Sequence, residues 1–174
     1  MRMKNIVISV VSLICLFFRT VFGNRIKYHF VSLISPSATI KTSKKGIIRF
    51  GYKNAVRKNS EISANGGFIE MGDNCFINRN CMIVSHNKIT LGNNVTIGPG
   101  CYIFDHDHDG NGSFNSRPIL IEDNVWIGSG SIVLKGVTIG HDSVIAAGSV
   151  ICKNVPPNTS VIQKRVSDYR IRNV

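Results

Sequence analysis

The first 60 residues of this 174-residue chain contain no aspartate or glutamate, although they carry twelve of its 21 lysine and arginine residues. The remaining 114 residues hold nine basic and all ten acidic side chains, so the formal net charge of +11 comes from the N-terminal third. Tryptophan is also scarce, with one residue, and recognised nucleic-acid-binding motifs are absent. These absences argue against a nucleic-acid binder and favour an anionic membrane surface as the partner of the basic third.

A long hydrophobic run is missing as well. Residues 6–18 are apolar or small, but thirteen residues are short for a membrane-spanning helix, which needs about 20. Residues 1–34 therefore have three interpretations. We favour an interfacial helix with basic flanks, which lies on the membrane surface. The alternatives are a secretory signal cleaved near residues 21–23 and a helix that caps the solenoid described below.

The five cysteines have no CxxC spacing, which argues against a disulfide framework or a zinc–thiolate site. Three of them, Cys75, Cys81 and Cys101, occupy the fifth position of six-residue units in which other copies carry valine or serine. We predict that these three are small core residues of a protein in a reducing compartment.

What the sequence does contain is a six-residue repeat with an aliphatic residue in its first position. Six units in one register span residues 121–156, and further units cover 71–88 and 91–108. A short fixed period is typical of a solenoid whose repeats bury a shared core by stacking. The pattern predicts an all-β solenoid with three faces and eighteen residues in each coil, with glycine or asparagine at corners where φ is unusual.

Departures from this period predict where loops leave the solenoid. Successive coils open at Phe50, Met71, Leu91 and Ile121, so the separations are 21, 20 and 30 residues instead of 18. The largest insertion, of twelve residues, follows His108 and covers about 109–118. Insertions in solenoids form loops on one side, which is often the binding side.

The segments GPGCYIFDHDHD, DNVWIGSGSIVLKGVTIG and IAAGSVICKNVPPN resemble the hexapeptide-repeat acyltransferases, in the branch of galactoside, maltose and capsular-polysaccharide O-acetyltransferases. The resemblance covers about residues 35–158; residues 1–34 and the basic tail 159–174 lie outside it. It implies a left-handed parallel β-helix, here preceded by an apolar, basic helical segment. It also implies a homotrimer that binds acetyl-CoA in grooves between neighbouring subunits and needs no metal.

The resemblance also implies a general base. Counting from Gly98-Pro99, as in the family, leads to His108, and imidazole is well suited to accept a hydroxyl proton at neutral pH. His106 is the second candidate base; we expect it to point the other way and to be an exposed loop histidine. Asp105 and Asp107 either orient an imidazole and contact acceptor hydroxyls or keep the turn soluble.

Two further residues are candidates for contact with the acceptor. Asn78 matches a position where the sugar acetyltransferases place an amide against the acceptor, although a corner asparagine that stabilises its own turn is an equal alternative. His86 stands where related enzymes carry an acidic acceptor contact, which indicates an acceptor other than a simple galactoside.

The residues implied for acetyl-CoA binding lie in the last coils and the tail. Trp126 is expected to face outward and line the pantetheine channel or a trimer contact. Small residues suit either close approach of the CoA arm or a tight trimer seam, and basic residues would contact the rest of CoA. The small candidates are Gly128, Ser129, Ala146 and Ala147, and the basic ones are Lys153, Lys164 and Arg165.

The sequence therefore predicts an acetyl-CoA-dependent O-acetyltransferase that acts on a saccharide in capsule, exopolysaccharide or envelope synthesis, with a lipid-linked saccharide as one hypothesis for the acceptor. Because CoA is cytosolic, we expect the protein in the cytoplasm, peripherally bound to the inner face of the membrane. The main alternative acceptor is serine or an amino-sugar. A γ-carbonic-anhydrase-like metal enzyme and a non-catalytic scaffold are less favoured, because His86, His106 and His141 do not reproduce a zinc spacing and a scaffold needs no insertion.

Overall fold

The computed structural model describes residues 25–29, 31–108 and 114–163, together with residue 10. The apolar run at 6–18 and the tail beyond 163 thus lie outside the described residues, apart from residue 10. Within the described part, no helix has the length and apolar character needed to cross a membrane.

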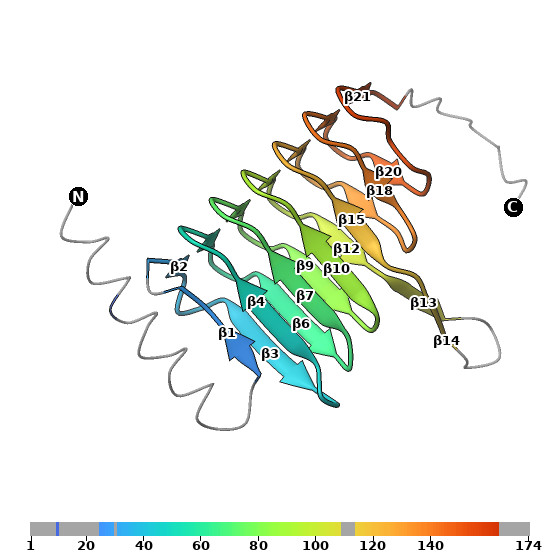
Figure 1. The fold of residues 1–174 in the computed structure, drawn as a ribbon. Helices are drawn as coiled ribbons and strands as arrows, with labels where there is room; N and C mark the ends of the chain where they lie inside the picture. The colour runs from blue at the N-terminus through green and yellow to red at the C-terminus, as the bar shows by residue number, and fades with distance from the viewer. Residues whose placement is uncertain (1–9, 11–24, 30, 109–113, 164–174) are drawn as a thin grey trace, which may run out of the picture.

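The described chain winds through three parallel sheets in strict rotation, so that each coil adds one strand to each sheet (Figure 1). The first sheet contains β1 (Ile26–Lys27), β4 (Ile47–Phe50), β7 (Phe68–Met71), β10 (Lys88–Leu91), β15 (Ile119–Ile121) and β18 (Thr138–Ile139). The second contains β2 (Leu33–Ile34), β5 (Ala55–Val56), β8 (Phe76–Ile77), β11 (Thr96–Ile97), β16 (Trp126–Ile127), β19 (Val144–Ile145) and β21 (Ser160–Val161). The third contains β3 (Thr39–Ser43), β6 (Glu61–Asn65), β9 (Met82–Ser85), β12 (Tyr102–Phe104), β17 (Ile132–Val133) and β20 (Val150–Ile151).

This arrangement confirms the predicted parallel β-solenoid. Sheet pairing begins at Ile26 and ends at Val161, so it extends past the expected limits of 35 and 158 at both ends.

The first-position aliphatic residues form the core. In the second sheet, Ile77 pairs with Ile97 and Ile97 with Ile127, and all three side chains are fully buried. Stacking equivalent residues in successive coils removes their apolar surface from water, which stabilises the coil-on-coil arrangement. Cys75, Cys81 and Cys101 are buried in the same prism, as predicted. Burial raises the pKa of the Cys75 thiol to about 11, which keeps that thiol protonated.

Asparagine occupies the corners, as the repeat predicts. Asn94 and Asn124 have φ values of 57° and 59°, a left-handed conformation that asparagine tolerates better than most residues. Their side chains also link the coils, because Asn94 Nδ2 donates to Asn124 Oδ1 at 3.0 Å and Asn124 Nδ2 donates to Asp142 Oδ1 at 3.0 Å. The corner residues therefore supply both the turn conformation and polar contacts between coils.

The insertion after the third-sheet strand β12 forms a hairpin. Its strands β13 (His106–His108) and β14 (Phe114–Ser116) pair antiparallel, with His106 opposite Ser116. The hairpin projects from the solenoid body in Figure 1. This agrees with the predicted insertion point and places both candidate bases on an ordered strand at the corner between the third and first sheets.

Candidate active site

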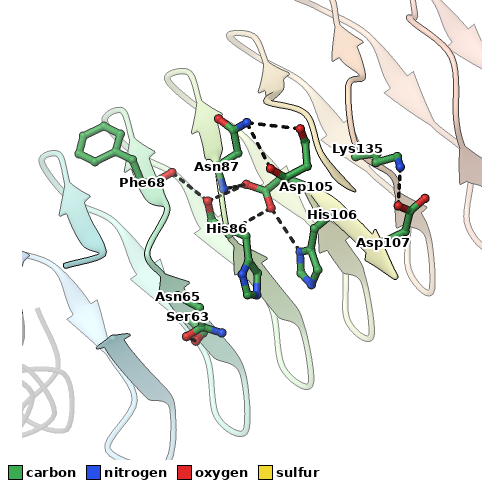
Figure 2. A network of polar contacts seen from close by, with 11 residues as sticks. Ser63, Asn65, Phe68, His86, Asn87, Asp105, His106, Asp107 and Lys135 are labelled. Carbon is green, nitrogen blue, oxygen red and sulfur yellow. Dashed lines mark hydrogen bonds and ion pairs between the residues drawn. The ribbon is translucent and has the colours of Figure 1, made fainter. Parts of the chain in front are cut away.

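A buried carboxylate organises this corner. Asp105 is fully buried and accepts hydrogen bonds from three groups of the preceding coil: the Ser85 hydroxyl at 2.7 Å, the His86 N–H at 2.8 Å and the Asn87 N–H at 2.8 Å (Figure 2). A buried carboxylate is costly without partners, and these donors offset that cost. Asp105 therefore fixes the turn between β9 and β10 and holds it against the base of the hairpin.

The same carboxylate holds an imidazole. His106 Nδ1 lies 3.3 Å from Asp105 Oδ1, and the His106 side chain is only 12% exposed. The expectation of an exposed loop histidine pointing away from His108 was wrong. Side chains two residues apart on a strand share a face, and the His106 and His108 rings meet edge-on with centroids 5.8 Å apart.

Three imidazoles consequently form a row across two coils. The His86 ring lies 4.1 Å from the His106 ring, and His106 in turn contacts the exposed His108. Burial, followed by the neighbouring His106, lowers the pKa of His86 below its usual 6.5. His86 is therefore a neutral imidazole at neutral pH. The described residues include no group of three or more His, Cys, Asp or Glu side chains that could hold a metal ion.

Asp107 has a different environment from Asp105. It is exposed and forms an ion pair with Lys135, on the side away from Asp105 in Figure 2. Sequence reasoning missed Lys135 and the Asp105 partners Ser85 and Asn87. The register of the coils predicts the position of Lys135. Because Tyr102 pairs with Ile132, Lys135 follows its strand at the position equivalent to Asp105 and so lies at the base of the hairpin.

Asn78 and the four small candidates lie at another corner, between the second and third sheets. The pairing of Ile77, Ile97, Ile127 and Ile145 places the residues that follow them in one column. That column contains Asn78, Gly98, Gly128 and Ala146, and beside it Ser129 neighbours Ala147.

Close packing explains part of this column without a ligand. A Cβ atom on Gly128 would lie 2.5 Å from the Ala147 nitrogen, so the adjacent coils approach too closely for a side chain there. Asn78 Oδ1 accepts the Arg79 N–H at 2.9 Å, so this asparagine does stabilise its own turn.

Trp126 stands on the outer face of the second sheet, as its position in the repeat predicts. Its side chain is 56% exposed, between Thr96 and Val144 of the adjoining coils. Lys153 is exposed near the C-terminal end of the solenoid. Lys164 and Arg165 lie outside the described residues. Because Ile103 pairs with Val133 and Val133 with Ile151, Lys153 lies at the corner of the histidines, two coils beyond Asp105. The histidines and the small-residue column thus lie at opposite edges of the third sheet, and one chain does not bring them together.

Replacing Asp105 with alanine should lower the free energy of unfolding by roughly 3 kcal/mol, because each buried donor left without a partner costs about 1–3 kcal/mol. Asp107→Ala is the matched control on the same hairpin, and losing its exposed ion pair should cost about 1 kcal/mol or less. Denaturant unfolding of both variants measures the difference. Equal losses would contradict the role assigned to Asp105.

Comparison with known proteins agrees with this structure. The family described as bacterial transferase hexapeptide (six repeats) matches residues 118–153, and the hexapeptide repeat of succinyl-transferase matches residues 69–105. The galactoside O-acetyltransferase of Escherichia coli is 42% identical over 99 residues, which are 53% of this chain and 49% of that protein. A putative acetyltransferase of Saccharomyces cerevisiae is 35% identical over 142 residues, 77% of this chain and 72% of the yeast protein.

Solved structures give the same result. A galactoside acetyltransferase in complex with coenzyme A superposes with a TM-score of 0.55 at 29% identity, over 71% of this chain and 72% of that one. The chain spans about half the length of the Escherichia coli enzyme and of a putative acetyltransferase from Schizosaccharomyces pombe that it also matches. With its repeats, its parallel solenoid and its identity to the yeast protein over most of that protein's length, the chain belongs to the hexapeptide-repeat transferase family.

Proposed function

We propose that this protein is an acetyl-CoA-dependent O-acetyltransferase that modifies a hydroxyl group of a saccharide, in capsule, exopolysaccharide or envelope glycan synthesis. One observation carries the proposal: at the corner where the hairpin leaves the solenoid, an imidazole row fixed by a buried carboxylate ends in the exposed His108. Relatives named galactoside O-acetyltransferase, and a related structure with bound coenzyme A, support the reaction class.

In the proposed reaction, His108 accepts the proton of the acceptor hydroxyl as its oxygen attacks the acetyl carbonyl carbon. The new C–O bond forms, the C–S bond to CoA breaks, and the departing thiolate takes up the proton. An exposed imidazole suits this role because an acceptor and a thioester can both reach it. His106 supports His108 through the edge contact of their rings and is itself held by Asp105.

We further propose that the active protein is a homotrimer, whose subunits combine the two groups of candidate residues. The outer face of the third sheet, which separates these groups, is apolar over four coils. Register places Met82, Tyr102, Ile132 and Val150 in one outward column, in which Tyr102 is 41% and Val150 42% exposed. Contiguous exposed apolar surface of this kind is typical of a protein contact. Contact between copies through this face would bring one subunit's histidines near the partner's corner column.

The proposed location is the cytoplasmic side of the membrane. Acetyl-CoA is cytosolic, and the twelve basic residues without an acid in positions 1–60 suit an anionic membrane surface. In cell fractionation, the full chain should sediment with membranes and be released by high salt, since exposed charge attraction is screened. Recovery of the protein, with residues 1–23 removed, from an exported fraction would contradict this placement.

His108→Ala should reduce kcat by about 10²–10⁴-fold, because general-base catalysis typically contributes that factor. Thiol release from acetyl-CoA with a panel of saccharide acceptors measures the rate. The matched control is His141→Ala, which removes an exposed histidine on another corner and should leave kcat unchanged. A His108→Ala enzyme with full activity would eliminate His108 as the base and make His106 the next candidate.

A further inference from the structure

A groove with a volume of about 440 Å³ lies at the corner between the second and third sheets. Leu33, Pro36 and Val56 contribute apolar lining, and Asn78 borders it. The other polar lining is strongly basic, since it includes Arg57, Lys58 and Arg79. None of the described residues that line the groove is acidic. The groove thus combines an apolar surface with three cations.

The solenoid register concentrates these cations. Val56 pairs with Ile77, so Arg57 lies beside Asn78 and Lys58 beside Arg79 on successive coils, about 4.8 Å apart. The main chain fixes this alignment, because the Arg57 N–H donates to the Ile77 carbonyl at 2.9 Å. The Arg57 guanidinium also lies over the Phe76 ring, 5.5 Å from its centroid. Positive charges are therefore held close together at a fixed place.

No acid neutralises these charges within the described part of the chain. The acids nearest in sequence are engaged elsewhere, since Glu61 pairs with Lys41 at 2.7 Å and Glu70 lies 3.9 Å from Arg49. Stacked like charges repel one another, and a bound anion would relieve that repulsion. Arginine forks match phosphate oxygens in geometry, and lysine adds a point charge. Three cations on two coils suit a group with several anionic oxygens better than a single carboxylate.

The groove lies at the N-terminal end of the small-residue column, because Asn78 belongs to both. Its corner column runs from Asn78 through Gly98 to Gly128, the position predicted to lie along the CoA arm. The cations occupy the coils on the N-terminal side of that arm, so they are placed for the acceptor. We propose, on the basis of the proposed function, that this groove binds the phosphate or pyrophosphate of a phosphate-linked saccharide acceptor. The phosphate group joins the saccharide either to a nucleoside or to a lipid, and both linkages present the same anionic phosphate oxygens.

The first test is calorimetric titration of the full-length protein with inorganic pyrophosphate. The variant Arg57→Gln/Lys58→Gln/Arg79→Gln should bind it at least about tenfold more weakly than the wild type, because charge-assisted hydrogen bonds are lost. Its three positions are exposed, so an unchanged melting temperature is expected and shows that the variant folds. Lys88→Gln, which removes an exposed lysine of the first sheet, is the matched control and should bind like the wild type.

Two results of this titration would overturn the proposal. One is equal pyrophosphate binding by the triple variant and the wild type. The other is competition by saturating CoA, which would assign the groove to the CoA phosphates. Unchanged pyrophosphate affinity in the presence of CoA is the expected result.

The second test compares one saccharide in three forms: free, nucleotide-linked and lipid-pyrophosphate-linked. The wild type should acetylate a phosphate-linked form with a kcat/KM at least about tenfold above that of the free sugar. The triple variant should lose this preference while its KM for acetyl-CoA stays unchanged, and the preferred form identifies the source of the phosphate. Equal kcat/KM for all three forms would overturn the proposal. Acetyl transfer to none of them, with pyrophosphate binding that still depends on the three cations, would count against the proposed reaction and support the anion site.

Discussion

The parallel pairing of successive coils is the constraint on which the whole structure depends. Each coil donates main-chain hydrogen bonds to the next at a spacing of about 4.8 Å, so a residue lies beside its equivalent in the coils before and after it. In the core this register stacks Ile97 between Ile77 and Ile127. On the surface it turns residues about twenty or thirty positions apart into neighbours.

The same register produces both groups of functional candidates. At the corner between the third and first sheets, Asp105 binds Ser85, His86 and Asn87 of the preceding coil. Its carboxylate thereby connects the hairpin, the imidazole row and the solenoid body. At the corner between the second and third sheets, small residues and cations occupy two adjacent columns. The apolar outer face of the third sheet lies between these corners, which is why the proposed site needs more than one subunit.

Much of the fold was predictable because the repeat has a fixed period. Six-residue units predicted the three-faced solenoid, the buried position of Cys81 and the corner asparagines such as Asn94. The coil lengths predicted the insertion after His108. These inferences depend on which residues recur, and recurrence is visible in one sequence.

The environment of single side chains was harder to predict. The string from Asp105 to Asp109 has the composition of a polar loop, yet Asp105 is fully buried because three donors of another coil converge on it. The ion pair of Lys135 with Asp107 depends on the 30-residue register between β12 and β17, which follows from the length of the inserted hairpin. The grouping of the cations at Arg57 and Arg79 required the register of β5 and β8.

A reaction site that is shared between subunits is tested most directly by mixed trimers of two inactive variants. His108→Ala removes the proposed base from one corner, and Ser129→Trp fills the small-residue column at the other. Each variant alone should lack activity, and refolding or co-expressing them together should restore a measurable fraction of wild-type kcat, because some interfaces then combine two intact halves. Mixed trimers that remain as inactive as either variant alone would contradict a shared site.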